Sequence, residues 1–225
     1  MSVSLGAFLV AFGASGCTFD EGSGTDEKTQ LRLCDVPASS GEGKLLRQVL
    51  DATELTTTFH NDDDDITEKL PERLREEDFQ GLGFPLEACS YTPQSSVGSS
   101  RLSLEYRWVA RDRSAGDGGE LPGKVSHYRM GDAVGESNDI SSRLRVECAL
   151  PGDVRKASSR ALLQGEASNT LDMGTEVEQV SKDRQVSFLY LMLRRAVGLL
   201  GCTNDPLTED PVAKPYATAS EAAAL

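Results

Sequence analysis

The alternation of apolar and polar residues predicts a sheet in the middle of the chain. Residues 101–111 alternate strictly, with Leu102, Leu104, Tyr106 and Trp108 on one side. A period of two is typical of a strand with one buried and one solvated face in an antiparallel sheet. Three further segments carry similar patterns: a weaker one at 124–130, and clearer ones at 142–150 and 160–168. We therefore expect about four strands.

The strongest helical pattern lies near the C-terminus. Over 183–201 the apolar residues recur three and four positions apart, which is the period of an amphipathic helix. Asp183 lies in the first turn, and Gly201 is well placed to end the helix. Arg194 and Arg195 interrupt the apolar run, so this segment is not a membrane span. We predict a core helix that packs across the sheet.

Shorter helices are expected before the sheet. Residues 38–51 predict a helix with an N-cap oxygen from Ser39 or Ser40. Residues 66–78 have helical character, and Pro71 suggests that the regular part begins there. The remaining segments are a strand or extended link at 55–59, an acidic run at 61–65 that is either a solvated loop or a helix start, and an apolar loop at 82–86. The fold class predicted is α+β, an antiparallel sheet packed by the long C-terminal helix and the N-terminal helices.

The first residues have the pattern of an export signal. Residues 3–14 are apolar or small, a length that suits a signal peptide and is too short to span a bilayer. They run into Ala14-Ser15-Gly16-Cys17, which resembles the bacterial lipobox, with Ala14 where Leu is usual. The resemblance implies that Cys17 becomes thioether-linked to diacylglycerol. The alternative is that 3–14 form a buried helix and Cys17 is an ordinary thiol.

The chain downstream of Cys17 divides by composition. Residues 18–30 are small, polar and acidic, a composition that favours a flexible linker. We expect a lipoprotein-type signal peptide at 1–16, an acidic tether at 17–30, a single α+β domain at 31–204 and an extended tail at 205–225. The two acyl chains that the lipobox implies suffice for stable anchoring. The predicted location is therefore the extracytoplasmic face of the cell membrane.

Four further cysteines are expected to form disulfides, because export leads to an oxidising compartment. They are Cys34, Cys89, Cys148 and Cys202. Three pairings are possible. The nearly equal separations of Cys34 from Cys89 and of Cys148 from Cys202 favour sequential pairing. No pair has C-x-x-C spacing, so structural disulfides are expected in place of a redox-active dithiol.

Charge and motif content exclude several functions. The chain has 23 Lys and Arg against 36 Asp and Glu, a net charge of −13, which argues against nucleic-acid binding. Residues 41–44 lack the first Gly and the final Ser/Thr of a P-loop. Residues 62–65 lack the Gly and the twelfth-position Glu of an EF-hand. With two His and no His/Cys cluster, we expect neither a metal site nor a cofactor.

The sequence lacks the common linear motifs of hydrolases. It contains neither G-x-S-x-G nor H-E-x-x-H, and no Ser–His–Asp set can be assembled by spacing. His60 lies beside the acidic run and is a candidate pH-sensitive group, whereas His127 is interpreted as an ordinary strand residue. A pair of glycosidase carboxylates leaves no linear motif, so that chemistry stays open.

The arrangement of the whole mature chain also suggests a class of protein. Its lipobox Cys, acidic linker, Cys-framed helices and strand-rich middle resemble secreted, lipid-anchored actinobacterial lipoproteins of uncharacterised function, as do the segments 145–152 and 189–202. The resemblance implies an envelope lipoprotein and carries over no catalytic residue. We predict a non-catalytic module that binds a small-molecule or protein ligand of unknown specificity. The alternatives are an extracellular hydrolase with a carboxylate pair and an extracytoplasmic sensor domain.

Overall fold

The computed structural model describes residues 32–75, 83–94, 101–111, 120–170 and 176–223. All of them belong to one compact unit that spans residues 31–225. The predicted signal peptide, the tether and Cys17 lie outside the described residues. Within those residues, no helix combines the length and apolarity needed to cross a bilayer.

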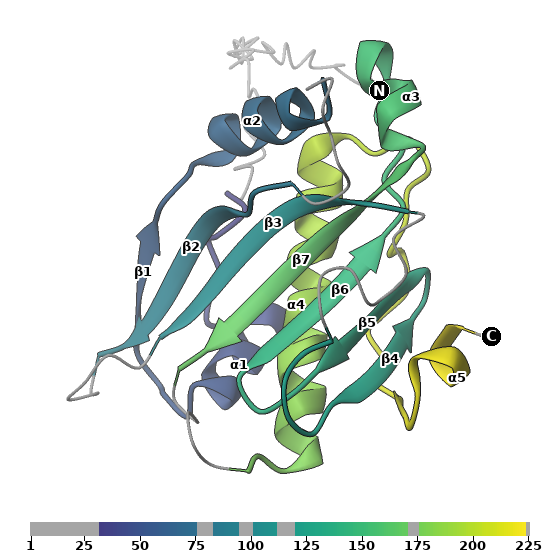
Figure 1. Ribbon diagram of the computed structural model, residues 1–225. Helices are drawn as coiled ribbons and strands as arrows, with labels where there is room; N and C mark the ends of the chain where they lie inside the picture. The colour runs from purple at the N-terminus through teal and green to yellow at the C-terminus, as the bar shows by residue number, and fades with distance from the viewer. Residues whose placement is uncertain (1–31, 76–82, 95–100, 112–119, 171–175, 224–225) are drawn as a thin grey trace, which may run out of the picture. The chain divides into compact units, whose positions relative to one another are not determined.

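The described strands form one antiparallel sheet of eight strands, in the order β1-β2-β3-β7-β6-β5-β4-β8 (Figure 1). The prediction of about four strands was therefore too low, although the mixed fold and the antiparallel sheet are confirmed. The strands are β1 (Leu55–Phe59), β2 (Leu86–Pro93), β3 (Leu102–Ala110), β4 (Ser126–Met130), β5 (Ala133–Ser137), β6 (Ser141–Val146), β7 (Ala161–Asn169) and β8 (Pro215–Tyr216).

Two of the additional strands lack the alternation that marks β3. Strand β2 is buried at six of its eight positions, and its pairing with β3 shifts register between Glu87 and Cys89. Strand β5 contains Gly135, where a Cβ atom would lie 1.9 Å from the carbonyl oxygen of Arg143. Only glycine permits this approach of β5 to β6, and glycine is depleted in ordinary strands.

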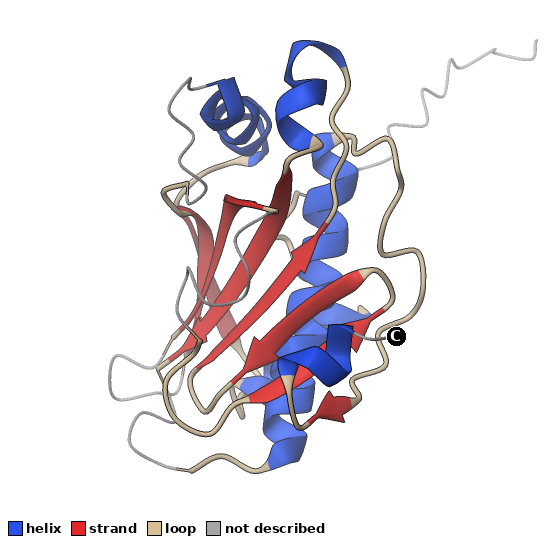
Figure 2. Cartoon of the chain, turned by 45° about the vertical axis from the view of Figure 1, so that its right-hand side comes forward, coloured by secondary structure: helices blue, strands red, loops and turns tan. Residues whose placement is uncertain are grey.

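The helices pack mainly on one face of the sheet. Helix α4 (Gln179–Leu200) runs along that face with α1 (Gly41–Val49) beside it (Figures 1 and 2). Ser40 is the N-cap of α1, since its side chain accepts a hydrogen bond from the Gly43 N–H. Gly201 ends α4 with φ of 67°, as its position in the sequence predicts. The remaining short helices are η1 (Gly152–Val154), α3 (Arg155–Ser158) and α5 (Ala219–Ala223), which lies against β4 and β5.

Helix α2 (Asp63–Arg75) begins earlier than Pro71, so the predicted start was wrong. The reason is a reciprocal cap: the Asp65 N–H donates to Asp62 Oδ1 at 2.9 Å, and the Asp62 N–H donates to Asp65 Oδ2 at 3.3 Å. The acidic run therefore starts the helix, where the helix dipole favours negative charge. Pro71 lies inside the helix and removes one backbone hydrogen bond.

The core lies between the sheet and α4. Tyr106 and Trp108 of β3 are fully buried there, and the Tyr106 hydroxyl donates to the carbonyl of Met192 in α4. Both expected disulfides are present, Cys34–Cys89 and Cys148–Cys202. The first ties the segment before α1 to the middle of β2, and the second ties the chain after β6 to the end of α4. The chain after 204 contributes β8, which pairs with β4.

Candidate functional site

The sheet face opposite α4 carries two rows of side chains, nearly all polar, that run across the strands. The pairing register aligns six ionisable residues, which we call the acidic row: Glu87, Glu105, Glu166, Arg143, Glu136 and His127. The neighbouring register positions form the arginine row: Arg107, Gln164, Arg145, Val134 and Arg129. Residues of one row on adjacent strands are close enough to interact. This face therefore concentrates charge that the sequence distributes over 80 positions.

One ion pair joins the two rows at their centre, and two more lie within the acidic row. Arg107 Nη2 lies 2.8 Å from Glu166 Oε2, and Arg143 Nε lies 2.9 Å from the same oxygen. Arg143 also approaches Glu136, with Nη1 3.7 Å from Oε1. These four side chains are only 9–16% exposed. At this burial, loss of one partner leaves an uncompensated charge, so the cluster fixes the relative positions of four strands.

Two arginines of the arginine row form no ion pair with any residue that the structure describes. Arg145 donates through Nε to Gln164 Oε1 at 2.8 Å, and Arg129 lies across Val134 from it. Neither guanidinium forms an ion pair with a carboxylate of the described residues. Both are partly buried. Burial lowers the pKa of Arg145; the charge of Glu136 acts against this shift, and the charge of Arg143 adds to it. An anion beside these groups would relieve this cost.

In the acidic row, Glu105 is the carboxylate without an ion-pair partner among the described residues. It lies between Glu87 and Glu166 and forms no ion pair with a described residue. Burial raises the pKa of Glu105, and the charges of Glu166 and Glu87 raise it further. Its ionised form is therefore less favourable in the folded protein than in the unfolded chain.

Replacing Glu105 with glutamine should stabilise the protein at neutral pH. A carboxyl whose folded-state pKa is raised stabilises the fold below its unfolded pKa, and this contribution is lost as pH rises through the folded value. Urea unfolding at about pH 8 should show Glu105→Gln to be more stable than the wild type, and the difference should vanish at about pH 4. Glu166→Gln is the control, since that carboxylate is ion-paired and its loss should destabilise the fold at about pH 8. A Glu105→Gln variant less stable than the wild type at about pH 8 would contradict this account.

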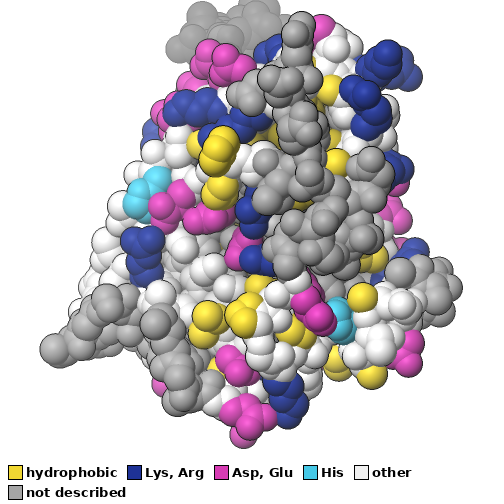
Figure 3. All heavy atoms as spheres, viewed as in Figure 1, with side chains coloured by type: hydrophobic (Ala, Val, Ile, Leu, Met, Phe, Trp, Pro, Cys, Tyr) yellow, Lys and Arg dark blue, Asp and Glu magenta, His cyan; other side chains and the backbone are white. Residues whose placement is uncertain are grey.

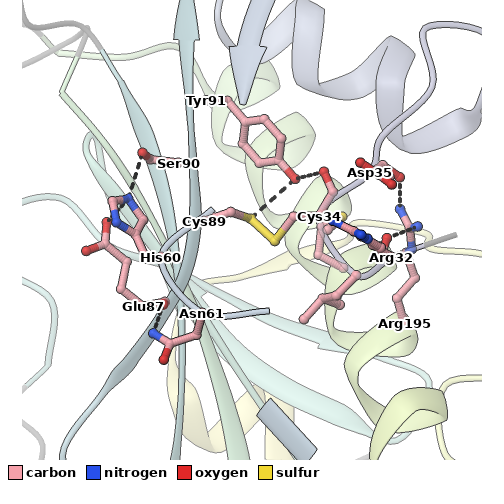
Figure 4. The surroundings of a disulfide bond; sticks show 12 residues. Arg32, Cys34, Asp35, His60, Asn61, Glu87, Cys89, Ser90, Tyr91 and Arg195 are labelled. Atoms are coloured by element: carbon pink, nitrogen blue, oxygen red, sulfur yellow. Dashed lines mark hydrogen bonds and ion pairs between the residues drawn. A yellow bond between two sulfur atoms is a disulfide. The ribbon is translucent and has the colours of Figure 1, made fainter. Parts of the chain in front are cut away.

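His60 lies at the β1–β2 end of the same face, close to a serine and a carboxylate (Figure 4). Its Nε2 atom is 3.1 Å from Ser90 Oγ and 3.3 Å from Glu87 Oε1. A serine nucleophile with a catalytic triad needs its acid on the other ring nitrogen, where the acid orients the imidazole. Because Ser90 and Glu87 both contact Nε2, these three side chains do not have the arrangement of a catalytic triad. On the opposite side of β2, the Tyr91 hydroxyl donates to the Cys34 carbonyl beside the disulfide.

His127 lies at the β4 end of the face, between two carboxylates. Its Nε2 atom is 3.4 Å from Glu120 Oε1. Glu136 is its register partner on β5, and one ligand atom from each of the three residues lies within 4.8 Å of the others. Burial raises the pKa of Glu136, whereas Arg143 and Arg145 act to lower it. Both imidazoles of the chain are visible on this face, each next to acidic side chains (Figure 3).

A hollow of about 520 Å³ opens at the turn between β5 and β6. Lys124, Asp139 and Glu176 contribute charged groups to its wall. These charges already satisfy one another: Lys124 pairs with Glu176 at 2.8 Å, and Lys182 pairs with Asp139 at 2.9 Å. The two rows are therefore the stronger candidate for a functional site, because Arg129 and Arg145 form no ion pair with a carboxylate in the described part of the chain.

The four disulfide cysteines and the two histidines were singled out from the sequence, but the two rows were not. The alternation did place residues such as Glu105 and Arg107 on the polar side of their strand. Their alignment with Arg143, Arg145 and the β7 residues depends on the pairing register. No family model, curated protein or solved structure matches this chain.

Proposed function

We propose that this chain is a lipid-anchored protein of the actinobacterial cell envelope, exposed on the extracytoplasmic side. We further propose that it binds, without catalysis, a ligand that presents carboxylate or phosphate groups. The observation that carries the proposed ligand class is the pair Arg129 and Arg145. These two partly buried arginines lie on one sheet face with strand β5 between them. Neither forms an ion pair with a described carboxylate.

Guanidinium groups suit this task, because their planar donors match carboxylate and phosphate oxygens in pairs. Arg129 and Arg145 are separated by two interstrand spacings, or about 10 Å, which suits a ligand with two anionic groups. The net charge of −13 does not oppose binding strongly at this range. Charges further than about 8 Å away are largely screened at physiological ionic strength.

The geometry near His60 supports a binding role over nucleophilic catalysis. Ser90 and Glu87 both contact its Nε2 atom, so the serine has no oriented base. The two disulfides also support the proposed location, because such bonds persist in oxidising compartments.

A second candidate function rests on Glu105. A carboxyl with a raised pKa beside other carboxylates, Glu87 and Glu166, has the properties of a general acid in a glycosidase. Turnover of an oligosaccharide by the wild type, lost in Glu105→Gln, would favour this hydrolase over the binding module.

Titration calorimetry with citrate and with inorganic phosphate tests the binding function. We expect one site per chain for citrate, weakened about tenfold or more in Arg145→Gln and in Arg129→Gln, because each variant loses charge-assisted hydrogen bonds. Arg155→Gln is the matched control, since that arginine is exposed on α3. Unchanged citrate affinity in both Arg145→Gln and Arg129→Gln would refute the proposed ligand class. So would the absence of binding of citrate and phosphate at millimolar concentration.

A further inference from the structure

We propose that Glu120, His127 and Glu136 form a binding site for a divalent transition-metal ion, with Zn²⁺ as the best-fitting ion. The three residues converge at the β4 end of the acidic row, and one ligand atom from each lies within 4.8 Å of the others. The site uses other residues than the proposed anion binding, although Glu136 and Arg145 interact electrostatically.

The dimensions of the cluster suit tetrahedral zinc. With zinc–ligand bonds of about 2.0–2.1 Å, the edge between two ligand atoms is about 3.3 Å. The observed distance from His127 Nε2 to Glu120 Oε1 is 3.4 Å. The other separations need shifts of about 1.5 Å or less to meet one ion. The Glu120 side chain is 64% exposed and has room to move.

Two of the three ligands are held firmly. His127 and Glu136 are 8% and 7% exposed, and they face each other across β4 and β5. Glu120, in contrast, is exposed and supplies the adjustable third ligand. The site is therefore largely preorganised, which lowers the cost of binding.

The charge of the cluster favours a cation. Glu120 and Glu136 bring two negative charges to a neutral imidazole. The nearest opposing charge is Arg143, which lies closer to Glu166 (2.9 Å) than to Glu136 (3.7 Å). Imidazole as a ligand favours Zn²⁺ and similar ions over Mg²⁺ or Ca²⁺. Three protein ligands would leave a fourth position open to water or to a ligand.

Competition for Zn²⁺ between the purified full chain and a chromophoric chelator tests the site. We expect one high-affinity Zn²⁺ per chain, unaffected by millimolar Mg²⁺. His127→Ala, Glu136→Gln and Glu120→Gln should each weaken binding about tenfold or more. Substituted Co²⁺ should give a visible absorption band of tetrahedral type that His127→Ala abolishes.

His60→Ala is the matched control, because His60 also contacts a glutamate on this face and should leave Zn²⁺ binding unchanged. If burial of His127 and Glu136 prevents their variants from folding, Glu120→Gln decides the question, since its side chain is exposed. Wild-type affinity in the Glu120→Gln and His127→Ala variants would overturn the proposal. So would the absence of high-affinity binding by the wild type.

Discussion

Replacing both Cys34 and Cys89 with alanine is expected to lower the free energy of unfolding by about 4 kcal/mol. The disulfide closes a loop with a sequence separation of 55 residues, and its removal returns that conformational freedom to the unfolded chain. A loss of this size is a large fraction of the total stability of a typical domain. Equilibrium urea unfolding measures it, with the fluorescence of Trp108, the single tryptophan and fully buried, as the probe.

The second disulfide supplies the control. Cys148–Cys202 has a sequence separation of 54 residues, so its removal should cost nearly the same chain entropy. Cys34 and Cys89 are both buried, whereas Cys202 is partly exposed. The Cys34/Cys89 variant should therefore lose more, because it also loses packing contacts. A loss of less than about 1 kcal/mol in both double variants would show that the loop-closure account is wrong.

The parts of the fold that could be predicted are those in which local pattern and tertiary burial agree. Strand β3 has one apolar and one polar face, so its alternation is visible in the sequence. Helix α4 buries a broad apolar stripe and ends at a glycine, which makes both its existence and its C-terminus predictable. The sequential disulfides followed from separation alone, because both pairs enclose loops of similar length.

Other elements depend on neighbours that the sequence does not name. Gly135 is unfavourable in an isolated strand, yet β5 forms because β6 approaches it closely. Strand β2 is flanked by β1 and β3 and is mostly buried, so its residues do not alternate, and the apolar loop predicted at 82–86 overlaps the strand only at Leu86. The alternative of a helix start at 61–65 was correct and the start at Pro71 was wrong, because the cap formed by Asp62 and Asp65 outweighs the local preference of Pro71 for a first turn.

The candidate site was even less accessible from the sequence. A shift of one residue in the pairing of β6 with β7 would move Arg143 and Arg145 out of alignment with Glu166 and Gln164. Their contacts are set by register, which depends on the packing of the whole sheet. The proposed zinc site illustrates the same point. Two histidines in the sequence do not suggest a metal site, but His127 lies close to Glu136 of β5 and to Glu120 in the segment before β4, and together they offer three ligands.

Replacing Cys17 with serine is expected to move the protein from the membrane fraction to the soluble fraction. Two acyl chains on Cys17 would hold the chain stably at a bilayer. With a net charge of −13, the protein has no general electrostatic attraction to anionic lipid headgroups that would substitute for them. The shift should therefore be nearly complete. Fractionation of cells that express each form, with a high-salt wash of the membranes, measures it.

The Cys34/Cys89 double alanine variant is the matched control, since it removes two cysteines and leaves Cys17 in place. It should stay in the membrane fraction even though it is less stable. Mass spectrometry of the wild type should also locate the lipid on Cys17. If Cys17→Ser sediments with washed membranes as the wild type does, the lipid anchor is wrong. Residues 3–14 would then have to be reconsidered as a helix that stays with the protein, and the extracytoplasmic location would rest on the two disulfides alone.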